Sequence, residues 1–233
     1  MAINGSELRT LPLLMHLPDV TLEHLSRNTL SKSVSKREVV AQKGERSAHL
    51  GFLRAGRLQG IDYTNDGREV GLYFFNPGDY FCEISIIDGA GQPEIITAIS
   101  KSEILLIPKD IIRPILFGVP KIAEALCQRL TERLREGLQQ RRIIGLPNPV
   151  QRVCAQLEIL MQTGDRDAMH VVRDTPTHQE LAIMINASRE TVTRAFQLLL
   201  GRGLIERRGN DLCINEPELL SMIARGEADI STL

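Results

Sequence analysis

The chain has 233 residues, of which 42% are hydrophobic and 24% are charged, and its formal net charge is -1. This composition is typical of a globular protein and excludes a mainly disordered chain. The charge balance alone does not indicate a nucleic-acid binder, since a local basic patch can be diluted by acidic surface elsewhere.

The four cysteines are scattered, with no CxxC pair and no spacing typical of zinc or iron–sulfur ligands. They are Cys82, Cys127, Cys154 and Cys213. We expect them to be small, mostly buried hydrophobic residues, and we expect no metal site. The first residues, MAINGSELRTLPLLMHLPD, lack a basic start followed by a long apolar stretch, and no apolar run reaches 18 residues. The sequence therefore predicts a cytoplasmic protein with reduced thiols and no membrane association.

Between about residues 34 and 108 the sequence consists of short β-like runs separated by turn signals. The runs include SAHLGFLRAGRLQGIDY and ISKSEILLIP, and the turn signals include Gly44, Gly56 and the segment NPGD at 76–79. Regularly spaced short strands predict a sandwich or barrel-like β domain.

After Pro108 apolar residues recur every three or four positions, which predicts one amphipathic helix over about 119–144. They are Val119, Ala123, Leu126, Leu130, Leu134 and Leu138. Periodicity alone favours a helix packed on its own β domain over one at a dimer seam. Arg133, Gly137 and Arg141 interrupt the stripe, so the coiled-coil pattern is weak. The segment GLPNPVQ at 145–151 predicts the end of the helix and a hinge.

The segment TPTHQELAIMINASRETVTRAFQLLLGRGLI, at 175–205, has the layout of a helix-turn-helix. Thr177 and Glu180 predict a capping box at the start of a first helix, and Ser188 predicts the cap of a second. Leu181 and Ile185 are expected to supply the buried face of the first helix. The buried stripe of the second helix is expected to be Val192, Ala195, Phe196 and Leu199.

This stripe leaves five polar residues on the opposite face of the second helix. They are Arg189, Glu190, Thr193, Arg194 and Gln197. Arginine can donate two hydrogen bonds to guanine, and glutamate can accept one from the amino group of cytosine, so this face suits the DNA major groove. The alternative is a solvated helix face on which Glu190 pairs with Arg194.

The following residues, GRGLIERRGNDLCI, predict a β-hairpin wing with strands at 204–206 and 212–214 and a turn at 208–210. Arg202, Arg207 and Arg208 around this wing are placed to meet phosphates, and we add the cap residues Thr177 and Ser188 to the expected DNA contacts. The sequence thus predicts a winged helix-turn-helix over about 150–216.

The order of these parts resembles the cyclic-AMP receptor protein/fumarate-nitrate reductase regulator (Crp/Fnr) family of bacterial transcription factors. The resemblance covers about residues 20–216, and its most specific motif is SRETVTR. It implies an α+β chain with a cyclic-nucleotide-binding-like β-roll at 1–118, a dimerisation helix and hinge at 119–146, and a winged helix-turn-helix at 147–233. It also implies a sequence-specific, non-enzymatic regulator that binds double-stranded DNA with RNA polymerase as a partner.

By the same resemblance, Arg189 and Arg194 would donate to guanines and Glu190 would accept from cytosine in a palindromic, TGTGA-like operator. The family also implies a homodimer with the long helix at the seam, which reverses the preference drawn from periodicity. The expected central seam or core contacts are Leu126, Leu130 and Leu134.

The effector pocket departs from the cyclic-AMP branch of the family. Glu83 is present, but the glycine expected before it is Cys82, and Gln92 and Pro93 occupy the positions of the Arg-Ser pair that holds the phosphate. The long-helix Thr-Ser pair that would meet adenine falls at residues 137–138, Gly-Leu. Burying an anion without a cation costs several kcal/mol. We therefore expect no arginine for the phosphate and no activation by cyclic AMP.

The effector itself stays open. An iron–sulfur cluster is disfavoured because the first cysteine is Cys82, whereas the oxygen-sensing branch has an N-terminal cysteine cluster. Haem-based gas sensing remains an alternative, although a lone histidine is more often structural than an axial ligand. The five histidines are His16, His24, His49, His170 and His178. A sensor of another small molecule, or a dimer that needs none, also remains.

Two other functional classes can be weighed on the residues. A metal or hydrolytic site could be imagined in the loop NPGDYFCEISIIDG, but no nucleophile and base are paired there, and acidic loop residues are usually solvated. Its candidate residues are Asp79, Cys82, Glu83 and Asp88. A ligand-binding module without a DNA role would require Arg189 and Arg194 to be dispensable.

Overall fold

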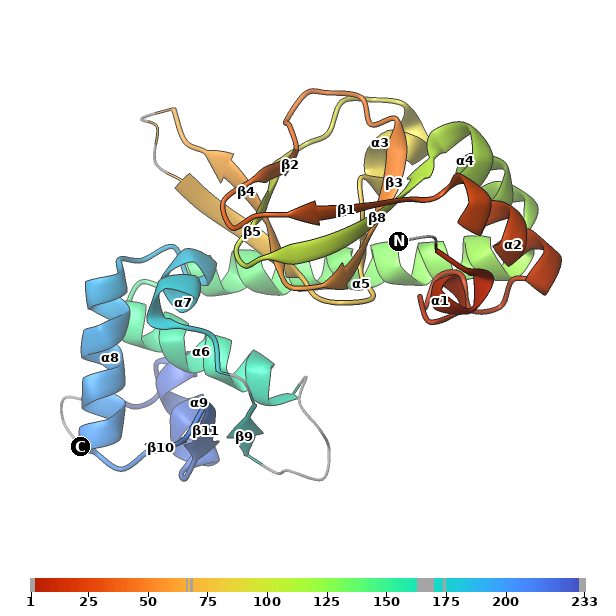
Figure 1. Ribbon diagram of the computed structural model, residues 1–233. Helices are drawn as coiled ribbons and strands as arrows, with labels where there is room; N and C mark the ends of the chain where they lie inside the picture. The colour runs from red at the N-terminus through yellow and green to blue at the C-terminus, as the bar shows by residue number, and fades with distance from the viewer. Residues whose placement is uncertain (1–2, 66, 68, 163–169, 174, 231–233) are drawn as a thin grey trace. The chain divides into compact units, whose positions relative to one another are not determined.

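The computed structural model describes residues 3–65, 67, 69–162, 170–173 and 175–230. The chain forms two compact units, Met1–Arg133 and Leu134–Leu233, and the boundary between them falls inside the long helix α5 (Pro120–Ile144). Figure 1 shows a first unit built mainly of strands and a second built mainly of helices. The predicted α+β class is confirmed, and the predicted domain boundaries at 118/119 and 146/147 stay predictions.

Two four-stranded antiparallel sheets form the β-roll of the first unit. The first sheet has the order β1 (Leu30–Val34), β8 (Ser102–Pro108), β3 (His49–Ala55) and β6 (Tyr80–Phe81). The second has the order β2 (Val39–Ala41), β7 (Ile95–Ala98), β4 (Leu58–Tyr63) and β5 (Glu69–Phe75). Strands of both sheets contribute to one apolar cluster that includes Leu53, Phe75, Phe81 and Ile96. The ring of Phe81 packs directly against Gly51 on β3, because Gly51 has no side chain and a Cβ there would lie 2.1 Å from that ring.

Helices cover the other apolar face of the β3 and β8 sheet. They are α1 (Gly5–Arg9), α2 (Asp19–Asn28), α3 (Glu83–Asp88) and α4 (Lys109–Gly118). Leucines of the first 25 residues, such as Leu8, Leu14 and Leu22, pack with Phe52 into a second core cluster. No helix was predicted for this segment, so α1 and α2 are additions to the predicted fold.

The helix predicted over 119–144 is α5. Its first half belongs to the core of the first unit, where Leu126 is 3% exposed and Leu130 is partly buried. Farther along, Leu134 is 65% exposed and Leu138 is 60% exposed. Cys127, on the same helix, is exposed, so the prediction of a buried cysteine is wrong for this residue. Its place beside Leu126 on the helix turns it away from the core that Leu126 enters.

The second unit carries the predicted winged helix-turn-helix. Its elements are α6 (Pro149–Gln162), β9 (Val171–Val172), α7 (His178–Met184), α8 (Arg189–Gly201), β10 (Ile205–Arg208), β11 (Asp211–Ile214) and α9 (Pro217–Arg225). The break between Ile144 and Pro149 confirms the predicted end of the long helix, whereas the hinge stays a prediction. The Asn148 side chain accepts a hydrogen bond from the Val150 N–H at 2.9 Å. The strands form one sheet of order β10-β11-β9. Within the described residues, no helix is long and apolar enough to span a membrane.

Candidate nucleic-acid interface and effector pocket

The start of α7 is fixed by the capping box that its sequence predicted. The Thr177 hydroxyl accepts a hydrogen bond from the Glu180 N–H at 3.2 Å, and the Glu180 carboxylate accepts one from the Thr177 N–H at 2.7 Å. Both contacts satisfy N–H groups that a helix start leaves without partners. Leu181 and Ile185 are fully buried, as the sequence predicted.

A tight turn joins α7 to α8. Asn186 adopts the left-handed conformation, with φ of 50°, which asparagine tolerates better than most residues. The N–H of Ala187 donates to the carbonyl of Ala182 at 2.9 Å and closes the turn. The cap of α8 then forms at Ser188, whose hydroxyl accepts from the Thr191 N–H at 3.1 Å. Local sequence thus sets where the second helix begins.

The two faces of α8 separate as the sequence predicted. The four residues of the predicted stripe are all buried: Val192, Ala195, Phe196 and Leu199. On the other face, Arg189, Glu190, Arg194 and Gln197 are exposed, and Thr193 is half-buried. Arg189, Glu190, Thr193 and Arg194 together line a shallow hollow in the surface. The polar groups are therefore concentrated at the N-terminal end of this face.

Glu190 is held in its charged form. Hydrogen bonds from its own backbone N–H and from the Ser188 hydroxyl lower the pKa of the Glu190 carboxyl. In the part of the chain that the structure describes, no ion pair within 4.0 Å joins Glu190 to Arg194. The alternative of a solvated face held by that pair is thereby weakened, and the carboxylate remains available to accept a hydrogen bond from a ligand.

The wing follows α8 after a glycine turn. Gly203, with φ of 71°, ends the helix and lets the Leu204 N–H donate to the carbonyl of Leu199 at 3.0 Å. Strands β10 and β11 pair from Ile205 with Ile214 to Arg208 with Asp211. At the turn, β10 extends two residues and β11 one residue beyond the predicted strands, and β10 begins one residue later than predicted. Three exposed arginines lie on this segment: Arg202, Arg207 and Arg208.

One contact of the wing was missed by sequence reasoning. The Nη2 atom of Arg207 lies 3.3 Å from Nε2 of His178, the first residue of α7. The sequence feature that could have indicated this contact is the position of His178 directly after Thr177, the residue that caps α7. The predicted phosphate contact Arg208 forms an ion pair with Glu206 at 3.1 Å.

In the first unit, Glu83 begins α3 and is 1% exposed. Cys82, where the family pattern has glycine, keeps the left-handed conformation that favours glycine, with φ of 66°. Burial raises the pKa of the Cys82 thiol to about 11, so it stays protonated at neutral pH.

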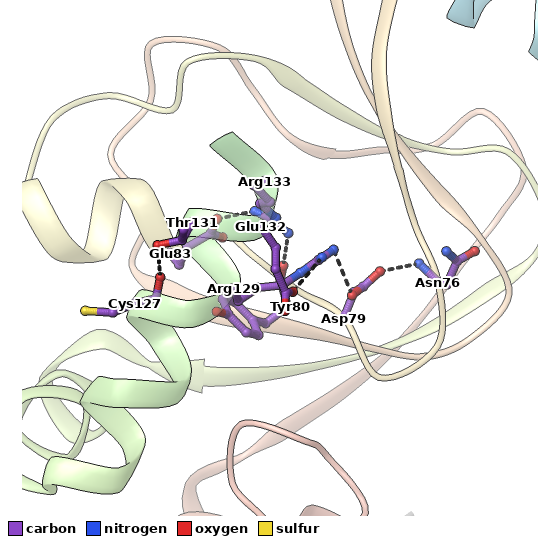
Figure 2. A network of polar contacts seen from close by, with 9 residues as sticks. All are labelled: Asn76, Asp79, Tyr80, Glu83, Cys127, Arg129, Thr131, Glu132 and Arg133. Atoms are coloured by element: carbon purple, nitrogen blue, oxygen red, sulfur yellow. Dashed lines mark hydrogen bonds and ion pairs between the residues drawn. The ribbon is translucent and has the colours of Figure 1, made fainter. Parts of the chain in front are cut away.

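The buried carboxylate of Glu83 has an arginine partner. Arg133 of α5 donates from Nη1 to Glu83 Oε1 and from Nη2 to the carbonyl of Tyr80 at 2.8 Å, as Figure 2 shows. Its guanidinium carbon lies 5.1–5.7 Å from the ring centres of Tyr73, Phe75 and Tyr80. The sequence predicted no arginine at the strand positions of Gln92 and Pro93, and it did not indicate that an arginine of the long helix pairs with Glu83.

A second buried carboxylate lies in the same region. Glu94 is 3% exposed and accepts hydrogen bonds from the Tyr73 hydroxyl at 2.6 Å and from Gln92 Nε2 at 2.8 Å. Gln92 is therefore buried, whereas Pro93 is exposed. Burial raises the pKa of Glu83, although the charge of Arg133 opposes this shift. Two buried carboxyl groups, Glu83 and Glu94, therefore lie near the guanidinium of Arg133.

The acidic residues of the neighbouring loop make structural contacts. Asp79 accepts from the Asn76 N–H at 2.8 Å and forms an ion pair with Arg129 at 3.3 Å (Figure 2). Asp88 accepts from the Ala90 N–H at 2.8 Å. No group of three or more candidate metal ligands occurs among the residues that the structure describes. Both carboxylates therefore hold backbone or side-chain groups of their own loop and of α5.

Family models and relatives match both units. The cyclic nucleotide-binding domain matches residues 31–117, and the Crp-like helix-turn-helix domain matches residues 151–223. The chain is 30% identical over 189 residues to the "CRP-like cAMP-activated global transcriptional regulator" of Mycobacterium tuberculosis, which covers 80% of this chain and 84% of the relative. The chain belongs to the Crp/Fnr family.

Solved structures of other Crp/Fnr proteins share the fold. FixK2 from Bradyrhizobium japonicum matches with a TM-score of 0.70 and 17% identity, over 84% of this chain and 96% of its own. A mutant of CooA from Carboxydothermus hydrogenoformans matches with a TM-score of 0.75 and 15% identity, over 96% of this chain and 97% of its own. At these identities the likeness concerns the fold alone. The Crp-like helix-turn-helix and the relatives make this Crp/Fnr protein a DNA-binding transcription regulator, in a family of regulators rather than enzymes.

Proposed function

We propose that this regulator binds a palindromic, TGTGA-like operator as a homodimer and does so without cyclic AMP. The observation that carries the proposal is the N-terminal face of α8, where Arg189, Glu190 and Arg194 are exposed beside a capped helix start. Two guanidinium groups can donate to guanines, and the charged Glu190 can accept from cytosine. Thr193 and Gln197 extend the same face.

The contacts that fix the register of the protein on DNA come from the ends of the elements around α8. Arg202, Arg207 and Arg208 supply positive charge on the wing, and the cap hydroxyls of Thr177 and Ser188 lie at the starts of the two helices. Helix starts and arginines both suit phosphate oxygens. We assign these residues to the DNA backbone and the α8 face to the bases.

The dimer rests on the exposed apolar positions of α5. Leu134 and Leu138 are four residues apart and lie on one face of the helix. Two leucines exposed by more than half are an apolar surface that a second copy of α5 would cover. Leu130, half-buried in the core, borders this surface, and Leu126 supports it from within. The seam is therefore centred nearer to residues 134 and 138 than the sequence predicted.

Independence from cyclic AMP follows from the charges of the pocket. The group that a cyclic phosphodiester needs is a cation that is not already neutralised. Arg133 is paired with Glu83, and Glu94 adds a second acidic group beside Gln92. Transfer of an anion into such surroundings is unfavourable by several kcal/mol. Relatives named for cyclic AMP share the domain, and this chain differs from their expected chemistry at Cys82, Gln92 and Pro93.

A different effector, if the domain binds one, would be neutral or cationic. Buried polar atoms that have no hydrogen-bond partner among the described residues point to such groups: Gln59 Nε2, Gln92 Oε1 and Tyr80 Oη. A neutral molecule with donors and acceptors could satisfy these atoms without adding negative charge. Haem is not favoured by any contact of the described histidines. We place the regulator in the cytoplasm, with DNA and RNA polymerase as its partners.

Fluorescence anisotropy with designed duplexes tests the operator geometry. Two inverted TGTGA half-sites with centres about one helical turn apart, 10–10.5 base pairs, let both copies of α8 enter the groove from one side. Insertion of about half a turn rotates one half-site to the far side of the duplex and should reduce affinity to that of a single half-site. Equal affinity for the two duplexes would contradict binding as a dimer. Added cyclic AMP should change neither affinity.

A further inference from the structure

His178 connects the three elements that face DNA under the proposed function. It begins α7, its Nδ1 atom lies 2.9 Å from the Thr193 hydroxyl on α8, and its Nε2 atom lies 3.3 Å from Nη2 of Arg207 on β10. Its ring packs on Phe196 of α8 with ring centres 4.6 Å apart. A single imidazole therefore contacts the base-reading helix on one side and the wing on the other.

The hydrogen bonds around the ring determine where its proton lies. The Thr193 hydroxyl donates its only hydrogen to the carbonyl of Arg189, at 2.9 Å, so toward His178 it can only accept. Nδ1 of His178 must then carry a hydrogen and donate it. A guanidinium can only donate, so Nε2 must offer a lone pair to Arg207. The neutral ring with its proton on Nδ1 satisfies both contacts at once.

The result is a chain of donors that runs in one direction: from Arg207 to His178, from His178 to Thr193, and from Thr193 to the carbonyl of Arg189. We propose that neutral His178 is a positioning residue that couples the wing arginine Arg207 to the base-reading helix, and that its protonation breaks this coupling. The inference rests on the proposed DNA-binding role of α8 and the wing. It adds a residue that the sequence analysis did not include in the site.

Protonation of His178 breaks only one of these hydrogen bonds, the one from Arg207. A proton on Nε2 turns that atom into a donor, so it can no longer accept from Arg207, whereas Nδ1 still donates to Thr193. The charged groups that face the ring are Arg189 from α8 and Arg207 from β10, and both are cations. Burial, followed by these two charges, lowers the pKa of His178 below its usual range. The coupled form therefore predominates at neutral pH and is lost under acidic conditions.

The test is a double-mutant cycle on operator affinity, because it separates coupling from the charge that a protonated ring adds near DNA. The four proteins are the wild type, His178→Ala, Arg207→Ala and the double variant, each measured at about pH 8 and at about pH 4.5. The lower value is about two units below the usual histidine pKa, because the pKa of His178 lies below its usual range. A phosphate attraction of the charged ring acts with or without Arg207 and cancels in the cycle. A contact between the two residues does not cancel.

At about pH 8 the double variant should bind about threefold to tenfold more tightly than the product of the two single losses predicts, as is usual for directly interacting residues. At about pH 4.5, where the ring is protonated, the two losses of affinity should multiply. In a His178→Gln background the amide can donate to Thr193 and accept from Arg207 at both pH values, so coupling to Arg207→Ala should persist at both. Circular dichroism melting of each variant confirms that it is folded.

Losses that multiply at both pH values would overturn the inference, and so would coupling that is equally strong at both in the wild-type background. The exposed His24 on α2, paired with Arg207→Ala in a second cycle, is the matched control and should show no coupling at either pH. If the wild type selects its operator while the His178 cycle is multiplicative, only this inference fails. If the wild type selects no operator at all, the proposed function itself fails.

Discussion

Replacement of Leu134 by glutamate should separate the dimer while leaving each chain folded. Leu134 is 65% exposed and Leu138 is 60% exposed in the single chain. Complete burial of a leucine contributes about 1.5–3 kcal/mol, so covering what remains exposed contributes about 1–2 kcal/mol per side chain. Twofold symmetry places four such side chains in the seam, for a total of about 4–8 kcal/mol.

The substitution Leu134→Glu removes two of the four leucine side chains from the seam and places two carboxylates of the same charge there. The loss of about 2–4 kcal/mol raises the dissociation constant of the dimer by about thirtyfold to about a thousandfold. Sedimentation velocity over a concentration series measures this change. Leu72→Glu is the matched control, since Leu72 is 41% exposed on β5 and should leave the dimer intact. Unchanged association of Leu134→Glu, or a wild type that is monomeric at micromolar concentration with DNA binding intact, would refute the reasoning.

The other predictions concern the pocket and the wing. Calorimetric titration should show no binding of cyclic AMP at physiological concentration, and a micromolar dissociation constant coupled to tighter operator binding would contradict the charge argument for the pocket. Arg133→Met should destabilise the first unit by about 3–5 kcal/mol in urea unfolding, because it leaves Glu83 buried without its cation; the less buried Arg129, changed in the same way, should cost less. Arg208→Ala should weaken binding to all DNA sequences alike and make the slope of log affinity against log salt shallower by about one per subunit, whereas a change of base preference would contradict its assignment to a phosphate.

Local signals in the sequence were sufficient for most of the DNA-binding unit. The capping box at Thr177 and the cap at Ser188 depend on residues three positions apart, and the buried stripe of α8 depends on helical periodicity. Both are short-range patterns, so they can be recognised from neighbouring residues without knowledge of the tertiary contacts. The hairpin turn at Gly209 was predictable for the same reason, since glycine there adopts φ of 65°.

Contacts between distant segments could not be predicted in this way. Arg133 interrupts the apolar stripe of α5, and periodicity alone counts it as a defect. In the structure it reaches Glu83, which is 50 residues away in sequence, and it lies among three aromatic rings. No local pattern indicates which partner a charged residue on a core helix will meet. The bridge from His178 to Arg207, 29 residues apart, was missed for the same physical reason.

The most direct measurement of the central claim is selection of bound sequences from a random pool of double-stranded DNA, with the wild type and Arg194→Ala run in parallel. The wild type should enrich a palindrome with TGTGA-like half-sites about one helical turn apart. Arg194→Ala should lose about 1–3 kcal/mol on that operator and relax the preference at one base pair in each half-site. Enrichment of no palindrome by the wild type, or of the same motif with the same stringency by both proteins, would show that α8 does not read bases in the way proposed.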